Sequence, residues 1–324
     1  MYPRLLADIG GTHARFAIEQ GGTIIDDRVL PCADYPELVV ALRSYLEAIG
    51  RSSAGAPVAA AMAIAAPLLG DRVAMTNHVW SFSAAALRQA MRWQRLILLN
   101  DFTALALAVP HLQAAELEQV GGVAAEPGQA RALLGPGTGL GVSGLAIAGG
   151  ILAPLQGEGG HVTLPATNGR EYALLAHLWR QFPHVSAERL LSGPGIELLY
   201  RTLCEVDGMP VEALSAQQIT TRGLTETAGP CRNTLEQFCA WLGTVAGDLV
   251  LTLGARGGVY IGGGIVPRLG GFFAQSAFRA RFAAKGRYAG YLAAIPAYVI
   301  RASHPALLGC ARAFTDPSPR HEAA

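Results

Sequence analysis

Lysine is almost absent from this chain of 324 residues, because Lys285 is the only one and arginine supplies the rest of the 25 basic residues. A Walker-type phosphate loop needs a lysine that reaches the phosphates, so this class of nucleotide site is excluded. The formal net charge of +1 gives no basic surface for nucleic acid or for an anionic membrane. The expected partners are therefore small molecules or further copies of the chain.

Cysteine is scarce and scattered, and long hydrophobic runs are missing. The five cysteines are Cys32, Cys204, Cys231, Cys239 and Cys310. None of their spacings is CxxC, which argues against a zinc site and against the disulfide framework of a secreted protein. No apolar run of about 20 residues is free of glycine, proline and charge, and the chain reaches Asp8 too soon for a signal peptide. We therefore expect a reduced, cytoplasmic protein.

Glycine is plentiful and marks a hairpin pattern that occurs twice. The first copy is 8–18 (DIGGTHARFAI), and the second is 135–145 (GPGTGLGVSGL). Each copy is typical of an apolar strand, a glycine turn with one threonine hydroxyl, and a second alternating strand. Such turns let backbone amides approach a phosphate closely. Two of them predict that the chain holds one polyphosphate.

A dinucleotide-binding loop is the alternative reading of the second copy. Gly139, Gly141 and Gly144 match the GxGxxG spacing of that fold. The fingerprint requires a helix after its last glycine, so that the amino end of the helix faces the pyrophosphate. Residues 145–150 (LAIAGG) instead continue as strand and turn. The match is accidental.

The rest of the chain alternates strands with helices, which predicts an α/β protein. The predicted strands are 5–8, 15–18, 24–30, 58–65, 95–99, 259–261 and 296–301. The predicted helices are 35–49, 83–91, 101–109, 171–181, 196–205, 216–222, 231–253 and 306–313. Pro110 ends the third of these helices. The last helix is expected to dock back on the first part of the chain.

Asp8 ends a predicted strand just before the glycine turn, and the pair Asn100-Asp101 follows another predicted strand. Aspartate is awkward inside a strand but suited to holding Mg²⁺ or its waters, which predicts a metal-linked role for Asp8. Asn100-Asp101 stands where a strand ends and a helix begins, the position at which open α/β sheets bind ligands. Asp101 could equally cap the helix that follows, and the residues alone leave both readings open.

Three further polar residues extend this set. Glu158 and His161 lie in the glycine-rich segment 157–161 (GEGGH), where neither gains much structurally. Glu188 could have a purely structural role, as an acid in the first turn of a helix that interacts favourably with the helix dipole. With Asn100 and Asp101, however, they form a group of hydrogen-bonding side chains suited to a neutral polyhydroxyl ligand. Phosphate turns beside such a group predict phosphoryl transfer to a sugar.

Seven segments in order carry a family resemblance. They are 6–12, 75–78, 100–104, 137–141, 158–162, 191–195 and 262–268 (LADIGGT, MTNH, NDFTA, GTGLG, EGGHV, LSGPG and GGGIVPR). Together they resemble the signature of the bacterial glucokinase family, from residue 5 to about residue 312. Seven ordered motifs are far more specific than any one of them.

The resemblance implies an actin-like ATPase (ribonuclease H-like) fold, with two α/β domains around a deep cleft. The small domain would comprise residues 1–110 and 302–324, and the large domain residues 111–301. The implied activity is ATP-dependent phosphorylation of D-glucose to glucose 6-phosphate, the first step of glycolysis, with Mg²⁺ as the metal. Members of the family are typically cytoplasmic homodimers.

The motifs also imply a role for individual residues. Asp101 is the general base. The sugar would be held by Asn100, Asp101, Glu158, His161 and Glu188. The phosphates would be held by Asp8, Ile9, Gly10, Gly11, Thr12, His13, Gly137, Thr138 and Gly139, with Mg²⁺ at Asp8 through water. Gly262, Gly263 and Gly264 would lie by the adenosine.

Two departures and two alternatives accompany the resemblance. His13 stands where many members carry asparagine, which leaves the turn intact but changes its side-chain contact. No cysteine lies near His161, so the structural zinc of the related repressor and sugar-kinase group is not expected. The alternatives are a kinase of another hexose, such as mannose, fructose or N-acetylglucosamine, and a non-catalytic sugar-sensing regulator. No nucleic-acid or membrane partner is expected.

Overall fold

A computed structural model of the protein describes residues 2–52, 55–68, 70–75, 78–148, 150–315 and 321–322. Residue contacts divide the chain into a first unit, Met1–Leu112 with Ala302–Ala324, and a second unit, Gln113–Arg301. Thr76 and Asn77 of the second family motif lie outside the described residues. Within the described ranges, no helix has the length and apolarity needed to cross a bilayer.

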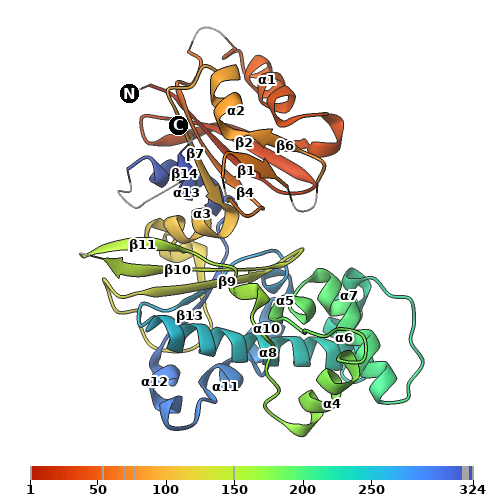
Figure 1. Cartoon of the computed structure of the whole chain (residues 1–324). Coiled ribbons are helices and arrows are strands. Elements are labelled where there is room, and N and C mark those ends of the chain that lie inside the picture. Colours follow the sequence, from red (N-terminus) through yellow and green to blue (C-terminus); the bar gives the residue numbers. More distant parts are fainter. Residues whose placement is uncertain are drawn as a thin grey trace. The chain divides into compact units, whose positions relative to one another are not determined.

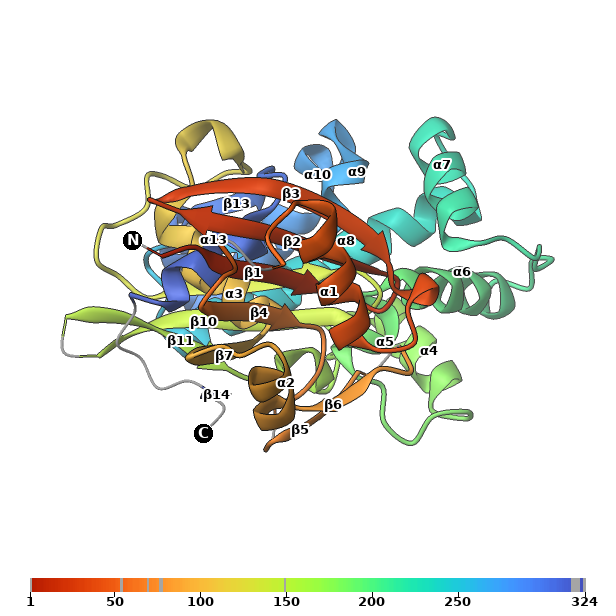
Figure 2. The same ribbon diagram turned by 90° about the horizontal axis from the view of Figure 1, so that it is seen from above.

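The first unit is built on a sheet with the strand order β14-β7-β4-β1-β2-β3. Its strands are β1 (Arg4–Ile9), β2 (His13–Gln20), β3 (Thr23–Pro31), β4 (Ala59–Ile64), β7 (Arg95–Asn100) and β14 (His321–Glu322). The first three form an antiparallel meander, and β4 and β7 run parallel to β1 (Figure 2). A separate hairpin consists of β5 (Arg72–Ala74) and β6 (Ser81–Ser83).

The register of the parallel strands aligns their carboxyl ends. Ile9 of β1 pairs with Ile64 of β4, and Ile64 pairs with Asn100 of β7. Each of these residues is the last of its strand. The segments that follow β1 and β7 therefore emerge from the same edge of the sheet, where ligands bind in open α/β folds.

Helices cover both faces of this sheet. They are α1 (Leu38–Ala48), α2 (Ala84–Ala90), α3 (Asp101–Ala108) and α13 (Pro305–Ala313), with the 3₁₀ turns η1 (Cys32–Asp34) and η2 (Val109–His111). Leu5 and Ala7 of β1 belong to the core that includes α1 and α2, whereas Leu6 belongs to the core of α3 and α13 (Figure 1). This alternation is the period of two expected of a strand buried on both faces.

The predicted start of α1 at residue 35 is wrong. The helix begins at Leu38, three residues later. Tyr35 precedes Pro36, and its backbone is extended, with φ −130° and ψ 129°. The proline ring disfavours helical backbone at the residue before it, which delays the helix. The prediction that Pro110 ends α3 is confirmed, because the chain passes there into η2.

The second unit contains a mixed sheet with the order β11-β10-β9-β12-β13-β8. Its strands are β8 (Leu117–Gln119), β9 (Arg131–Pro136), β10 (Leu140–Ala148), β11 (Ile151–Gln156), β12 (Val259–Ile261) and β13 (Ala297–Ile300). β9, β10 and β11 form an antiparallel meander, and β12 joins β9 in parallel. The second glycine hairpin, β9 and β10, is confirmed, as is the strand that continues after its last glycine.

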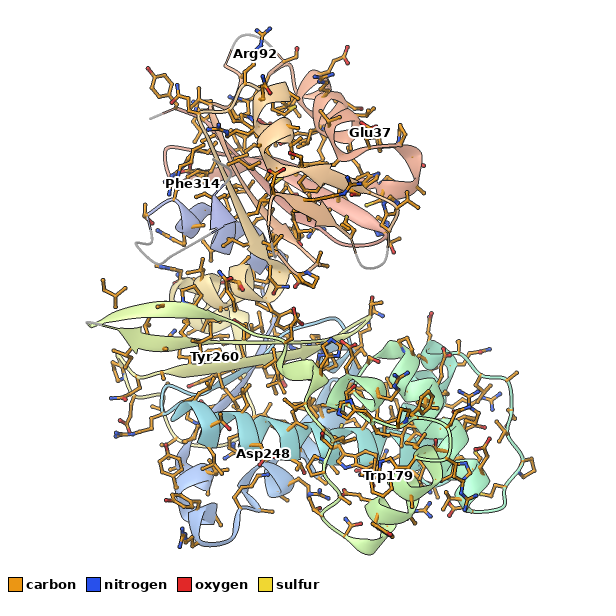
Figure 3. The ribbon with its side chains drawn as sticks, in the orientation of Figure 1. Glu37, Arg92, Trp179, Asp248, Tyr260 and Phe314 are labelled. Atoms are coloured by element: carbon orange, nitrogen blue, oxygen red, sulfur yellow. The ribbon has the colours of Figure 1, made fainter. Side chains whose placement is uncertain are left out.

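Helices make up the rest of the second unit. They are α4 (Gly169–Leu178), α5 (Ala187–Leu190), α6 (Gly193–Val206), α7 (Ala216–Thr225), α8 (Pro230–Leu253), α9 (Val266–Leu269), α10 (Gly271–Gln275), α11 (Phe278–Ala283) and α12 (Ala289–Ala294). The 3₁₀ turns are η3 (Ala114–Glu116), η4 (Gly159–His161) and η5 (Gly286–Tyr288). The long helix α8 carries Asp248, whose carboxylate accepts a hydrogen bond from Lys285 Nζ at 2.6 Å (Figure 3).

Helix α13 docks on α3, as the sequence predicted for the last helix. The contact is close because Gly309 faces the backbone of α3. A Cβ added at Gly309 would lie 1.7 Å from the carbonyl oxygen of Ala104. Leu307 and Cys310 pack beside it against Leu107. The return of the chain to the first unit therefore depends on a residue without a side chain.

Substitution of Gly309 by alanine should lower the free energy of unfolding by about 1–3 kcal/mol, because the added methyl group overpacks this contact. In an unobstructed helix the same change gains up to about 1 kcal/mol. Gly290→Ala in α12 is the matched control, since nothing lies within 4 Å of its added Cβ. Urea unfolding measures both variants, and equal stability of the two would contradict the close contact of α13 with α3.

Candidate active site

The β1–β2 turn of the first unit is held by its own backbone. Gly10 N donates to His13 O at 3.0 Å, and Cys32 N donates to Thr12 O at 2.9 Å. The first bond closes the turn on itself, and the second holds it to η1, which follows β3. Thr12 and His13 are exposed, so the turn presents backbone and a hydroxyl group to solvent, as a phosphate-binding turn requires.

Asp8 lies two residues before this turn and faces a cluster of charges. It pairs across the strands with Arg15, and directly opposed residues share one face of the sheet. Arg15 Nη1 contacts His304 Nδ1, and His304 Nε2 lies 3.3 Å from Asp27 Oδ2. Burial raises the pKa of the Asp8 carboxyl, and the charges of Arg15 and His304 oppose that increase. The cluster was not predicted, because it joins residues far apart in the sequence.

A magnesium ion fits Asp8 only in one mode of binding. Among the residues that the structure describes, no three His, Cys, Asp or Glu side chains are grouped as metal ligands. Mg²⁺ bound with a nucleotide takes one or two carboxylates and completes its shell with phosphate oxygens and water. A single carboxylate beside a phosphate-type turn suits that mode and does not provide a complete protein site.

Asn100, and not Asp101, caps helix α3. Asn100 Oδ1 accepts hydrogen bonds from Phe102 N at 2.9 Å and from Thr103 N at 3.3 Å. Asp101 occupies the first turn, where its Oδ1 accepts from Phe102 N at 2.9 Å. A negative charge is favourable at this end of a helix. The cap that competed with a functional role for Asp101 is thus supplied by its neighbour.

In the second unit, Glu188 joins the glycine hairpin to the rest of the site. Its Oε2 accepts a hydrogen bond from Leu140 N at 2.8 Å. The approach requires glycine at position 139, because a Cβ there would lie 2.4 Å from the same oxygen. The turn itself is closed by Gly137 N, which donates to Gly139 O at 2.8 Å.

The segment that carries Glu158 and His161 packs on the same hairpin. A Cβ added at Gly160 would lie 2.1 Å from the carbonyl oxygen of Leu140. His161 Nδ1 lies 3.8 Å from Glu188 Oε1, and the two side chains are 59% and 33% exposed. Glu158 is exposed. An imidazole and two carboxylates therefore stand at one accessible surface of this unit.

A short antiparallel pairing brings Glu188 to this segment. Thr163 bridges to Ser186, Ala187 N donates to Val162 O at 2.8 Å, and Leu164 N donates to Val185 O at 3.0 Å. Ser186 Oγ then caps α5 by accepting from Arg189 N at 3.2 Å. Glu188 is a first-turn acid of that helix, as one reading of the sequence allowed, and it also contacts the hairpin.

Two further glycine segments meet the hairpin. Gly262 N donates to Leu134 O at 2.9 Å, and Gly263 has a φ of 76°. Gly193 N donates to Gly137 O at 2.8 Å, and Ser192 caps α6. No role for Ser192 and Gly193 was predicted, although their motif was one of the seven.

The predicted site residues thus form two groups, one in each unit. Asp8, the segment 9–13 and Asn100-Asp101 share one sheet edge in the first unit. In the second unit, the segment 137–139 forms the turn of the hairpin, and Glu188, His161 and the segment 262–264 lie around it. Carboxylates accept hydrogen bonds, and the amide and imidazole groups can also donate them, so the set suits hydroxyl groups. The glycine turns suit phosphate.

Replacement of Gly139 by alanine should break the hydrogen bond between Glu188 and Leu140 N, because the methyl group would occupy the position of the carboxylate. We expect the Leu140 amide to exchange its hydrogen about 10-fold faster or more, as loss of a bond to a charged group allows. Gly137→Ala is the control, since a Cβ there meets nothing within 4 Å. Hydrogen exchange of the two variants makes the comparison, and unchanged exchange in Gly139→Ala would disprove the contact.

Comparison with known proteins finds relatives that match nearly the whole chain. The family model described as Glucokinase matches residues 5–317. A glucokinase of Aromatoleum aromaticum is 55% identical over 315 residues, which cover 97% of this chain and 95% of the relative. A glucokinase of Chromobacterium violaceum is 52% identical over 316 residues, or 97% of this chain and 90% of the relative.

A solved structure agrees with these relatives. The crystal structure of a glucokinase from an Antarctic psychrotroph has a TM-score of 0.87 and 37% sequence identity, and the match covers 97% of this chain and 99% of that one. The predicted fold class, an α/β protein of the actin-like ATPase type, is confirmed. The predicted family is confirmed as well. The chain belongs to the glucokinase family.

Proposed function

We propose that this chain transfers the γ-phosphoryl group of ATP to the 6-hydroxyl of D-glucose, with Asp101 as the general base. Membership of the glucokinase family gives the reaction, phosphorylation of glucose. The observation that carries the residue assignment is the strand register, which aligns the end of β1, before the glycine turn, with the end of β7, before Asp101. A phosphate-type turn and a carboxylate thus share one edge of the sheet.

Asp101 has the chemistry and the position of a proton acceptor. A positioned aspartate carboxylate can act as the general base for a hydroxyl group. It accepts the proton of the 6-hydroxyl as that oxygen attacks the γ-phosphorus, while the bond to the leaving ADP oxygen breaks. Its Oδ1 accepts a hydrogen bond from Phe102 N at 2.9 Å, which holds the side chain at the first turn of α3.

The phosphates would be held mainly by backbone amides. The turns at 10–12 and 137–139 supply them, as expected for the preorganised dipoles that stabilise developing charge. The only lysine pairs with Asp248 on α8 and belongs to the structure of that helix. Mg²⁺ at Asp8, when bound, supplies further positive charge to the phosphate oxygens. Gly262, Gly263 and Gly264 would lie by the adenosine.

The sugar would be held by groups with free capacity for hydrogen bonds. Asn100 uses its oxygen as the helix cap, so its amide NH₂ is left as a donor. Glu188 uses Oε2 for Leu140 N, so Oε1 is left as an acceptor next to His161. Glu158 adds a second carboxylate. We propose that these groups and Asp101 bind the same glucose molecule.

The names of related structures support ATP and glucose as substrates. A glucokinase of Balamuthia mandrillaris was solved with glucose, and a ROK family glucokinase of Streptomyces griseus with glucose and AMPPNP. We further propose that the two units are the small and the large domain, and that the predicted boundary at residue 110 falls within η2. The family resemblance favours a cytoplasmic homodimer that acts at the first step of glycolysis.

Replacement of Asp101 by asparagine tests the general base. Asparagine keeps an oxygen for Phe102 N, so the fold and glucose affinity should be preserved, while turnover falls by about 10²- to 10⁴-fold. Coupled ADP release measures turnover, and calorimetric titration measures glucose affinity. Near wild-type turnover in this variant would refute the assignment.

The wild-type enzyme in the same assay tests the substrate. Glucose should give the highest kcat/KM in a panel that includes mannose, fructose and N-acetylglucosamine. A higher value for another hexose would change the substrate, and no ADP release with any of them would refute a kinase.

A further inference from the structure

One fully buried carboxylate has no part in the proposed chemistry. Glu171, in the first turn of α4, is 0% exposed. Its Oε1 accepts from Arg281 Nη1 at 2.7 Å and from Gln237 Nε2 at 2.9 Å. Its Oε2 accepts from Thr167 N at 2.8 Å, from Thr167 Oγ1 at 2.9 Å and from Arg281 Nη2 at 3.2 Å. Three separate segments of the second unit therefore meet at one side chain.

The Glu171 carboxylate is ionised in spite of its burial. Burial raises its pKa, but hydrogen bonds from Arg281, Gln237 and Thr167 outweigh this effect and leave the pKa below its ordinary value. A buried ion pair gains little net stability over apolar packing, because both ions lose their hydration. Its established use is to fix one arrangement of the chain among several. The relevant question is which segment Glu171 and Arg281 fix.

They hold the segment 162–168, which runs from His161 to α4. Thr167 is bound through both its amide and its hydroxyl group, and Arg281 Nη2 also contacts that hydroxyl. Trp241 Nε1 of α8 donates to Pro165 O at 3.0 Å within the same segment. At its other end the segment pairs with residues 185–187, which lead to Glu188. It is therefore anchored at both ends, with His161 just beyond the second anchor.

We propose that Glu171 and Arg281 are positioning residues of the sugar site, which act through Thr167 to keep His161 against Glu188. The inference rests on the proposed function, because it assumes that His161 and Glu188 bind the sugar. Neither Glu171 nor Arg281 is one of the residues proposed to bind the substrates. Their contribution is to restrict the chain between α4 and η4, so that glucose meets a site that is already ordered.

Thr167→Val is the mildest test, since it removes the hydroxyl and keeps the shape and the amide. We expect the KM for glucose to rise about 10-fold, with a smaller change in kcat and in the KM for ATP. Thr167→Ser restores the hydroxyl and should restore the glucose KM. Glu171→Gln should raise the glucose KM at least as much, and its melting temperature is recorded because loss of a buried charge can also unfold the chain.

Asp207→Asn is the matched control. Asp207 binds Arg170, the residue before Glu171, through two hydrogen bonds of 2.6 Å, but this pair is partly exposed and does not reach the segment 162–168. Its glucose KM should equal that of the wild type. If Thr167→Val and Glu171→Gln lose thermal stability yet keep the wild-type glucose KM, the pair is structural only and the proposal is overturned.

His161→Ala separates this proposal from the one on which it rests, because the positioning role assumes that His161 binds the sugar. Weaker glucose binding in His161→Ala together with a wild-type glucose KM in Thr167→Val overturns the positioning role alone. Unchanged glucose binding in His161→Ala overturns the assignment of His161 to the sugar site, and the positioning role with it. Weaker binding in both variants, with rescue by Thr167→Ser, supports both proposals.

Discussion

The hydrogen bond from Leu140 N to Glu188 Oε2, 2.8 Å long, is the interaction on which the second unit's part of the site depends. It joins a glycine turn suited to phosphate with a carboxylate suited to sugar hydroxyls. Charged acceptors form the stronger hydrogen bonds of proteins, and the other oxygen of Glu188 lies 3.8 Å from His161 Nδ1. In the proposed function, this side chain would link the phosphate turn to the sugar site.

Because lysine is nearly absent, the proposed phosphate site depends on other positive groups. Lys285 pairs with Asp248, and two arginines are held by side chains of their own unit. Arg15 contacts His304 and lies near Asp27, and Arg281 is bound to Glu171. Charge on the phosphates would therefore be met by backbone amides and by a metal at Asp8. Such dipoles are fixed before the substrate arrives, which suits catalysis.

Local patterns made most of the fold predictable from sequence. Alternating apolar residues indicated β1, β2 and β3, and glycine turns indicated both hairpins. The strand Val259–Ile261 and the ends of α8 and α13 were located to within about one residue. The helices α9 to α12 were missed, because they are short and each depends on packing against the rest of the unit. The strand β14 was missed for the same reason, since two residues carry no periodicity.

The candidate site was predictable where a motif was local. Asn100-Asp101, Glu158 and His161 stand out by the strand end or the glycines beside them. The alternative for Asp101 could be settled only by structure, which gives the cap to Asn100. The pairs Arg15–His304 and Glu171–Arg281 join residues far apart in the chain, and nothing near either member signals its partner. Such pairs between distant segments become visible only in the folded structure.

The central claim, that one carboxylate couples the phosphate turn to the sugar site, is tested most directly by Glu188→Ala. The KM for glucose and the KM for ATP are measured for this variant and for Glu158→Ala, which removes an exposed carboxylate just before η4. The account predicts that both constants rise about 10-fold in Glu188→Ala, whereas only the glucose constant rises in Glu158→Ala. A wild-type KM for ATP in Glu188→Ala would contradict it.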